Sequence, residues 1–259
     1  YMAERAFKPA TAGDLWFHIG RVGGQPVAAV AASWTDQPGL PQINVSASCE
    51  AGATVVTLKQ SRFAVGDALP GGPWRVPVRL ARGADARTVM LDGASLRAEL
   101  PGCGAEPLRA NAGGSGYCVV EYDKPLRERL GADFAALPPA DRAVLRSDSF
   151  ALAYAGRQPM VAHLQLLLAL PSVQDASRTA LVAMAASQWR RLDLALHGTP
   201  AQAPLRQAGK ALFGPELARL GWYPAAGDNS QTQSLRASLI QRLAGMNDAP
   251  TIAAARDRF

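Results

Sequence analysis

Hydrophobic and polar positions along this 259-residue chain change their period twice. Near the start, Leu15, Trp16 and Ile19 recur at helical spacing. Further on, apolar and polar residues alternate as they do in strands, and after Pro125 the helical period returns and persists. The pattern predicts a mixed all-β plus all-α fold. Its parts are a helical hairpin at 1–36, a β-sandwich at 37–124 and a helical domain at 125–259.

The segment 33–41 separates the predicted hairpin from the predicted sandwich and contains Pro38, Gly39 and Pro41. Proline fixes the backbone φ angle and lacks an N–H, so neither a helix nor a central strand continues through it. We expect a rigid joint here, with Trp34 buried inside it. In the hairpin itself, Asp14 is the expected N-cap of the first helix.

Short alternating segments with glycine and proline between them follow the joint, which is typical of a small antiparallel β-sandwich. Pro77 lies on the polar side of its segment, and this position predicts an edge strand or a bulge. The expected strands are 43–47, 56–60, 74–80, 88–91, 95–100, 108–110 and 117–122.

Successive helical patterns of similar length with short turns occupy the rest of the chain and predict a solenoid-like domain of the HEAT or armadillo type. The chain opens inside one helical pattern and stops inside another, so we expect both ends to be truncated. The expected helices are 125–136, 139–155, 159–170, 173–196, 201–220, 230–245 and 250–259.

Composition narrows the class of protein. Apolar residues make up 48% of the chain and charged residues 19%, which is a globular composition. The net charge is +6, but the arginines are scattered and form no run with aromatic residues between them, so nucleic-acid binding is not predicted. Apolar runs such as 164–170 are too short to span a bilayer, and no membrane span is expected.

The cysteines are Cys49, Cys103 and Cys118. Their number is odd and no pair has the C-x-x-C spacing, so the sequence predicts neither a disulfide framework nor a zinc knuckle. This pattern favours a reducing compartment, and we expect a cytoplasmic protein.

A zinc hydrolase needs histidine and carboxylate ligands at close spacing on a helix, as in the motif His-Glu-x-x-His. The histidines of this chain are His18, His163 and His197, which lie far apart and are not followed by such a motif. No metal ligand and no catalytic residue is predicted in the chain. His163 lies in an apolar run and is expected in the core.

Two other groups have both a chemical and a structural interpretation. Ser115 lies in a glycine-rich stretch that lacks the Gly-x-Ser-x-Gly pattern, which favours a glycine turn. Asp141, Arg142 and Asp148 could form an acid–base set. We favour helix capping by Asp148 or Ser147 and an ion pair of Arg142 instead.

Taken in order along the chain, several motifs resemble the zinc aminopeptidases of the membrane alanyl aminopeptidase type, a gluzincin family. The chain departs from that pattern at Cys118 and Val119, where the family often has an aromatic residue and an arginine. The matching motifs are Asp14-Leu15-Trp16, Ser33-Trp34-Thr35-x-Gln37-Pro38-Gly39-x-Pro41, Gln60-x-Arg62-Phe63, Trp74 to Val78, Asn111 with Gly116-Tyr117-x-Val119-x-x-Tyr122-Asp123, Asp141 to Gly156, Leu220-Gly221-Trp222 and Leu235-Arg236.

In that family the amine-binding motif and the zinc ligands precede the part that this chain resembles. The resemblance therefore implies that residues 1–36 end a missing catalytic domain, where zinc is expected, and that this chain alone is inactive. The sandwich and the helical lid would enclose the site at which N-terminal residues are removed from peptide substrates. Arg142, Arg178 and Arg236 are substrate-cavity candidates by residue type only, and Arg236 is also expected to pair with a helix C-terminus.

A second hypothesis is a stand-alone, non-enzymatic scaffold in which the sandwich and the solenoid bind a protein or a peptide. The ordered motifs favour the aminopeptidase fragment over this alternative.

Overall fold

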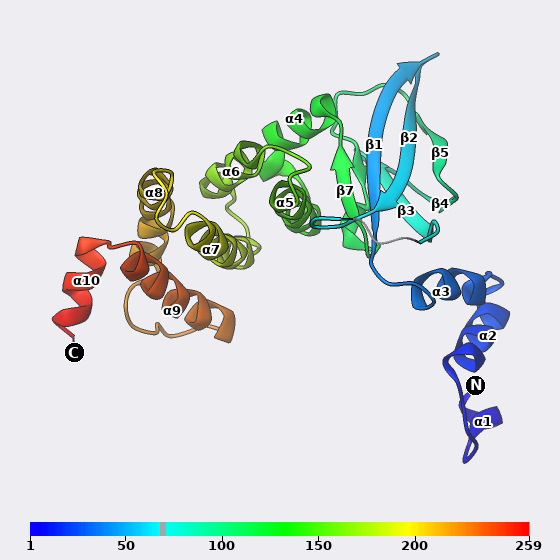
Figure 1. Ribbon diagram of the computed structural model, residues 1–259, viewed down its shortest axis with the longest axis horizontal. Helices are drawn as coiled ribbons and strands as arrows, with labels where there is room; N and C mark the ends of the chain where they lie inside the picture. Colours follow the sequence, from blue (N-terminus) through cyan, green and yellow to red (C-terminus); the bar gives the residue numbers. More distant parts are fainter. Residues whose placement is uncertain (68–70, 259) are drawn as a thin grey trace. The chain divides into compact units, whose positions relative to one another are not determined.

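The computed structural model describes residues 1–67 and 71–258, and the chain divides into two compact units, Tyr1–His163 and Leu164–Phe259. The first unit contains the N-terminal helices, the sheets and the first helices after them, and the second unit is helical (Figure 1). The mixed β plus α class predicted from the sequence is therefore confirmed.

The N-terminal helices are α1 (Met2–Arg5), α2 (Ala12–Gly23) and α3 (Val27–Thr35). The expected N-cap was wrong by one turn, because Thr11 and not Asp14 caps α2. The Thr11 hydroxyl accepts from the Asp14 N–H, and the Asp14 carboxylate accepts from the Thr11 N–H at 2.8 Å, which is a capping box. Gly24 ends α2 in the left-handed conformation.

The sandwich consists of two facing sheets, with the strand orders β5-β2-β1-β7 and β4-β3-β6 in the part of the chain that the structure describes. All the predicted strand segments are present. Their inward side chains, among them Ile43, Leu58, Val76 and Leu91, are fully buried and form the core. The bounds are β1 (Pro41–Glu50), β2 (Ala53–Arg62), β3 (Arg75–Arg82), β4 (Asp85–Asp92), β5 (Ser95–Pro101), β6 (Arg109–Ala110) and β7 (Val119–Tyr122).

Two details of the sandwich differ from the prediction. Strand β7 lies parallel to β1, because the chain reaches it by crossing from the other sheet and not through a hairpin. Strand β3, which contains Pro77, is not an edge strand but lies between β4 and β6. Since β6 pairs only with Leu80 and Ala81, one side of Pro77 faces no partner strand and the missing N–H is tolerated.

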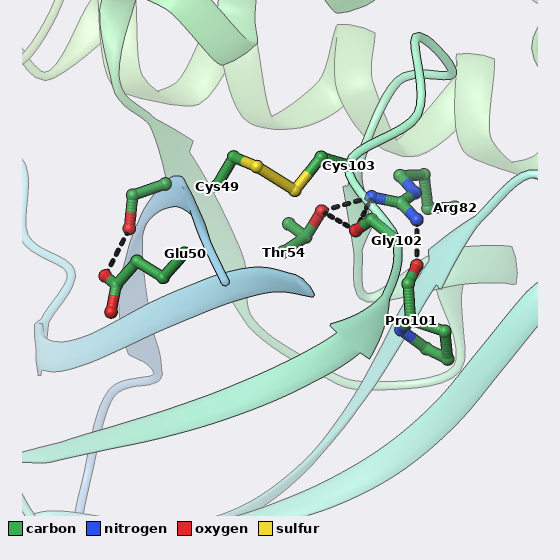
Figure 2. Close-up of a disulfide and its surroundings, with 8 residues drawn as sticks. Cys49, Glu50, Thr54, Arg82, Pro101, Gly102 and Cys103 are labelled. Carbon is green, nitrogen blue, oxygen red and sulfur yellow. Dashed lines mark hydrogen bonds between the residues drawn. A yellow bond between two sulfur atoms is a disulfide. The ribbon is translucent and has the colours of Figure 1, made fainter. Parts of the chain in front are cut away.

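A disulfide joins Cys49 to Cys103, with 5.6 Å between their Cα atoms (Figure 2). The prediction that these cysteines form no disulfide was wrong. Their separation of 54 positions gives no local spacing from which the pairing could be inferred, whereas the sheet brings their backbones together. Cys118 is a free, buried thiol.

Three helices follow the sandwich: α4 (Lys124–Ala132), α5 (Pro139–Tyr154) and α6 (Met160–Leu168), with short 3-10 turns at Phe134–Ala136 and Leu170–Ser172. Asp123 caps α4 by accepting from the Leu126 N–H at 3.0 Å. Helix α5 packs against β7, beside which it lies in Figure 1. This helix runs through Ser147 and Asp148 without interruption, so the N-cap predicted at Asp148 or Ser147 was wrong.

The second unit contains α7 (Arg178–Ala195), α8 (Gln202–Leu220), α9 (Ser230–Gly245) and α10 (Ala249–Arg256). Helices α7, α8 and α9 pack on one another, and α10 packs on α9. The Trp189 ring on α7 meets the Phe213 ring on α8 edge-on, at 5.6 Å between centroids. Gly209 permits this approach, since a Cβ there would lie 2.6 Å from the Trp189 Nε1.

The helix expected at 250–259 is present up to Arg256, and its last residue, Phe259, lies outside the described residues. The HEAT or armadillo character of the domain stays a prediction. Among the described residues, no helix combines the length and the apolar character needed to cross a bilayer.

Candidate functional site

The proline-containing segment after α3 forms a joint between the N-terminal helices and the sandwich. The Trp34 Nε1–H donates to the Arg75 carbonyl at 3.1 Å, and the Arg75 N–H donates to the Ser33 hydroxyl at 3.1 Å. The Trp34 ring also lies 6.2 Å from the Trp74 ring and 6.3 Å from the Tyr117 ring, between centroids. Side chains of helix α3 thus bond to both the N–H and the carbonyl of Arg75, the first residue of β3.

Arg62, at the end of β2, connects the second half of the joint. Its guanidinium lies over the Trp74 ring, 4.4 Å from the centroid, and its Nη2 donates to the Gln37 side-chain oxygen at 2.7 Å. The Gln37 amide donates in turn to the Ser33 carbonyl at 2.8 Å. Gly39 has φ +94°, a conformation that favours glycine, and a Cβ there would lie 2.7 Å from the Arg62 Nη1 and would displace the guanidinium.

Three of the motifs that carry the family resemblance, those around Trp34, Arg62 and Trp74, therefore meet at one place in space. Gln60 joins them, because its side chain donates to the Trp74 carbonyl and accepts from the Trp74 N–H, each at 2.9 Å. Trp34 was expected to be buried but is half-buried, because the joint lies at the surface of the first unit. The chemistry of this group is stacking and hydrogen bonding, and it contains no nucleophile beside a base.

The polar residues of α5 meet the sandwich at a second, buried cluster. Asp141 accepts from the Arg109 guanidinium and from the Gly113 N–H, each at 2.5 Å. Asp148, two turns further along the same helix, accepts from the Val120 N–H on β7 at 3.0 Å. The two aspartates thus anchor α5 to the sandwich, Asp141 at β6 and the connection that follows it and Asp148 at β7.

Tyr122 completes this cluster from the sandwich side. Its hydroxyl donates to the Ala110 carbonyl at 3.1 Å and accepts from the Ala110 N–H at 2.8 Å. Asn111 follows with φ +56°, and its amide side chain exchanges hydrogen bonds with the Gly116 backbone at 2.7 and 3.0 Å. The glycine turn predicted around Ser115 is therefore confirmed, and it carries β6 into β7.

Burial changes the acidity of this cluster. It raises the pKa of Asp148 to about 7, against the opposing effect of the Val120 N–H, and raises the pKa of the Cys118 thiol to about 12. The hollow lined by Asp141, Asp148 and Tyr122 has a volume of about 10 Å³. A hollow of that size holds one water at most, so no substrate reaches these carboxyl groups. The structural interpretation of Asp141 and Asp148 is the one that the geometry supports.

His163, on α6, is fully buried, as expected from its apolar surroundings. Its ring lies 5.2 Å from the Phe150 ring, and neither ring nitrogen has a hydrogen-bond partner among the described residues. Burial, with the charge of Arg146 as a second cause, lowers its pKa to about 4, so the ring is neutral at pH 7.

The three arginines named as substrate-cavity candidates each have partners inside the protein. Arg142 is 1% exposed and donates to the Ala135 carbonyl at 2.7 Å. Arg178 begins α7 and donates to Glu216 of α8, with 2.9 Å between Nε and Oε1. Arg236 of α9 pairs with Asp228.

Arg236 also donates to the Gly221 carbonyl at 3.0 Å and to the Leu220 carbonyl at the end of α8. The expected pairing of Arg236 with a helix C-terminus is confirmed. Arg178 and Arg236 lie on different helices of the second unit, and among the described residues they bond to different partners, Glu216 for Arg178 and Asp228 with the end of α8 for Arg236. A role of these arginines toward substrate stays a prediction.

No group of three or more histidine, cysteine, aspartate or glutamate side chains that could hold a metal ion occurs among residues 1–67 and 71–258. His18 lies against Glu4, and His163 lies in an apolar core, so neither belongs to a ligand set of the zinc type. The described residues do not fit a zinc ion.

Comparison with known proteins extends these observations to the whole chain. Residues 108–259 match the family described as the ERAP1-like C-terminal domain. Aminopeptidase M1-A of Oryza sativa subsp. japonica is 27% identical over 270 residues, which cover 100% of this chain and 30% of the relative. Aminopeptidase N of Lactobacillus helveticus is 27% identical over 264 residues, again 100% of this chain and 30% of the relative.

Puromycin-sensitive aminopeptidase of Caenorhabditis elegans is 26% identical over 273 residues, which are 97% of this chain and 27% of the relative. The chain thus spans about 30% of the length of the curated relatives that it matches. These matches run through the joint and the α5 cluster and confirm the resemblance drawn from the ordered motifs. The chain belongs to the ERAP1-like C-terminal domain family of the aminopeptidases.

Proposed function

We propose that this chain is the non-catalytic portion of a zinc aminopeptidase that removes N-terminal residues from peptides. One observation carries the proposal: aminopeptidases match essentially the whole chain, yet the chain spans only about 30% of their length. Since the described residues contain no group that fits zinc, the metal and the groups that bind the peptide amine would belong to another part of the protein.

In this proposal residues 1–36 end the catalytic domain, residues 37–124 form the sandwich and residues 125–259 form the helical wall that encloses the active site. The surface of α2 supports the first assignment. Phe17 is 61% exposed and Val22 is 86% exposed, so the helix presents apolar side chains that further catalytic-domain residues would cover.

The joint explains how such a portion would serve catalysis without reacting groups. Its hydrogen bonds and the stacked Arg62–Trp74 pair connect α3 to the sandwich rigidly. The α5 cluster then connects the sandwich to the first helices after it. The sandwich and the helices that follow it up to His163, held at both junctions, would keep a fixed position relative to the catalytic domain, which is a positioning role.

We also propose that Arg142, Arg178 and Arg236 line the substrate cavity of the whole enzyme. Replacing Arg236 by methionine in the whole enzyme separates the two possible roles. A substrate contact would raise KM for peptides at unchanged thermal stability, and an internal brace would lower the midpoint of unfolding at unchanged KM.

The proposal is tested with the purified chain and with the whole protein from its native gene, assayed in parallel. We expect the whole protein to bind zinc stoichiometrically and to hydrolyse amino-acyl arylamides, and the chain alone to do neither. Metal-dependent turnover by the chain alone would contradict the absence of catalytic residues. A whole protein without peptidase activity would favour the binding scaffold instead.

A further inference from the structure

The disulfide lies at one end of the larger sheet and connects two strands that are not neighbours. Cys49 is near the end of β1, and Cys103 follows directly after β5, with β2 between the two strands (Figure 2). In the sheet register Cys49 stands opposite Thr54 of β2, and Ala53 forms a bridge with Gly102. The backbone pairing itself therefore brings the two cysteines together.

A buried arginine from the other sheet holds the Cys103 side of this pair. Arg82 is 6% exposed and donates to the carbonyls of Pro101 and Gly102 and to the Thr54 hydroxyl, as Figure 2 shows. The Thr54 hydroxyl also donates to the Gly102 carbonyl at 2.8 Å. This network uses no sulfur atom, so it places Cys103 beside Cys49 whether or not the bond has formed.

The two thiols are also in reach of an external oxidant. Cys49 and Cys103 are both exposed, and their Cα separation of 5.6 Å lies in the usual range for a disulfide. Cys118, by contrast, is buried, and the raised pKa of its thiol keeps the thiol protonated. Of the three cysteines, Cys49 and Cys103 thus form an exposed pair, and Cys118 is a buried, unreactive thiol.

We propose that Cys49–Cys103 is a structural disulfide of the mature protein and that the protein is folded in an oxidising compartment outside the cytoplasm. An exposed pair would be kept reduced by the thiol systems of the cytoplasm. The oxidant is a thiol–disulfide oxidoreductase: the two cysteine thiols form one S–S bond and lose two electrons and two protons, while the disulfide of the oxidoreductase takes them up as two thiols. This inference differs from the cytoplasmic expectation, which rested on the odd number of cysteines and their spacing and stays a prediction.

The test is differential thiol labelling of the whole protein in cells of its source organism. Cells are quenched in acid, free thiols are labelled with one maleimide under denaturing conditions, and the remaining thiols are labelled with a heavier maleimide after reduction. Trypsin places the cysteines in separate peptides, which are 22–59, 98–109 and 110–127. The same cells are fractionated, and each fraction is probed for the protein.

We expect the peptides of Cys49 and Cys103 to carry only the second label, the Cys118 peptide to carry only the first, and the protein to be found outside the cytoplasm. Without reduction, the first two peptides should run as one species lacking two hydrogens. First-label modification of Cys49 and Cys103, or a cytoplasmic location of the protein, would overturn the proposal.

Two variants add a second readout. The Cys118→Ser variant is the matched control, and its non-reduced peptide map should still contain the linked species. In the Cys49→Ser variant, Cys103 should take the first label at full occupancy. If Cys103 instead stays blocked, it pairs with another thiol and the proposed bond is wrong. The labelling is done on denatured protein, so the readout does not depend on how well either variant folds.

Discussion

Replacing Trp34 by alanine should release α3 from the sandwich. Truncating a fully buried tryptophan costs about 3–5 kcal/mol. Trp34 is half-buried and donates one hydrogen bond to the Arg75 carbonyl, a bond worth about 1 kcal/mol. We therefore expect the free energy of opening the joint to fall by about 2 kcal/mol, which is roughly a 30-fold rise in the open population.

Native-state hydrogen exchange measures this opening without requiring global unfolding. Amides of α3 should exchange about 30-fold faster in the Trp34→Ala variant, while amides of β1 should keep their rates. Trp34→Phe keeps most of the ring contact but loses the Nε1 donor, so it should show about a fivefold effect.

Thr35→Ala is the matched control, because Thr35 is exposed at the end of the same helix and its hydroxyl bonds to Ala31 and Asp36 and not to the sandwich. Its exchange rates in α3 should stay close to those of the unaltered chain. Unchanged α3 exchange in Trp34→Ala would show that the joint carries no packing energy, and the account of the family motif as a rigid connection would be wrong.

Further substitutions test the remaining structural claims. Gly39→Ala should destabilise the joint by about 2 kcal/mol, since alanine is strained at φ +94° and meets Arg62; an unchanged urea midpoint would contradict this. Tyr122→Phe removes the hydroxyl that binds both backbone groups of Ala110, and should lower the free energy of unfolding by about 2 kcal/mol, measured by urea titration; a loss below about 0.5 kcal/mol would show that the bonds are dispensable. Asp148 and His163 should make the free energy of unfolding change with pH in opposite directions. The folded pKa of Asp148 is raised to about 7, so its contribution is lost as pH rises from about 4 to 7, whereas the folded pKa of His163 is lowered to about 4, so its contribution is lost as pH falls from about 6.5 to 4. In urea titrations over this range, the Asp148→Asn variant should gain stability with rising pH relative to the unaltered chain, and His163→Gln should lose it; equal slopes in both variants would refute the assignment.

Much of the fold follows from local sequence signals. The helix expected at 139–155 is found at Pro139–Tyr154, and the one expected at 230–245 is found at Ser230–Gly245, because periodicity and turn residues are local properties. The joint could also be located, since prolines at 38 and 41 interrupt both kinds of secondary structure.

The features that the sequence did not indicate depend on long-range contacts. The partner of Cys49 is 54 residues away, and only the register of β1, β2 and β5 places it there. Asp148 has the residue type of a helix cap, but its partner is the Val120 N–H on a strand, so it is tolerated inside α5. The parallel pairing of β7 likewise depends on the crossover between sheets.

The native gene upstream of the codon for Tyr1 provides the most direct test of the central claim, that this chain is one portion of a zinc aminopeptidase. The account predicts an open reading frame there that encodes His-Glu-x-x-His on a helix and a further glutamate ligand later in the frame. A start codon directly before Tyr1, with no such frame, would contradict the account and leave a binding scaffold that shares the fold.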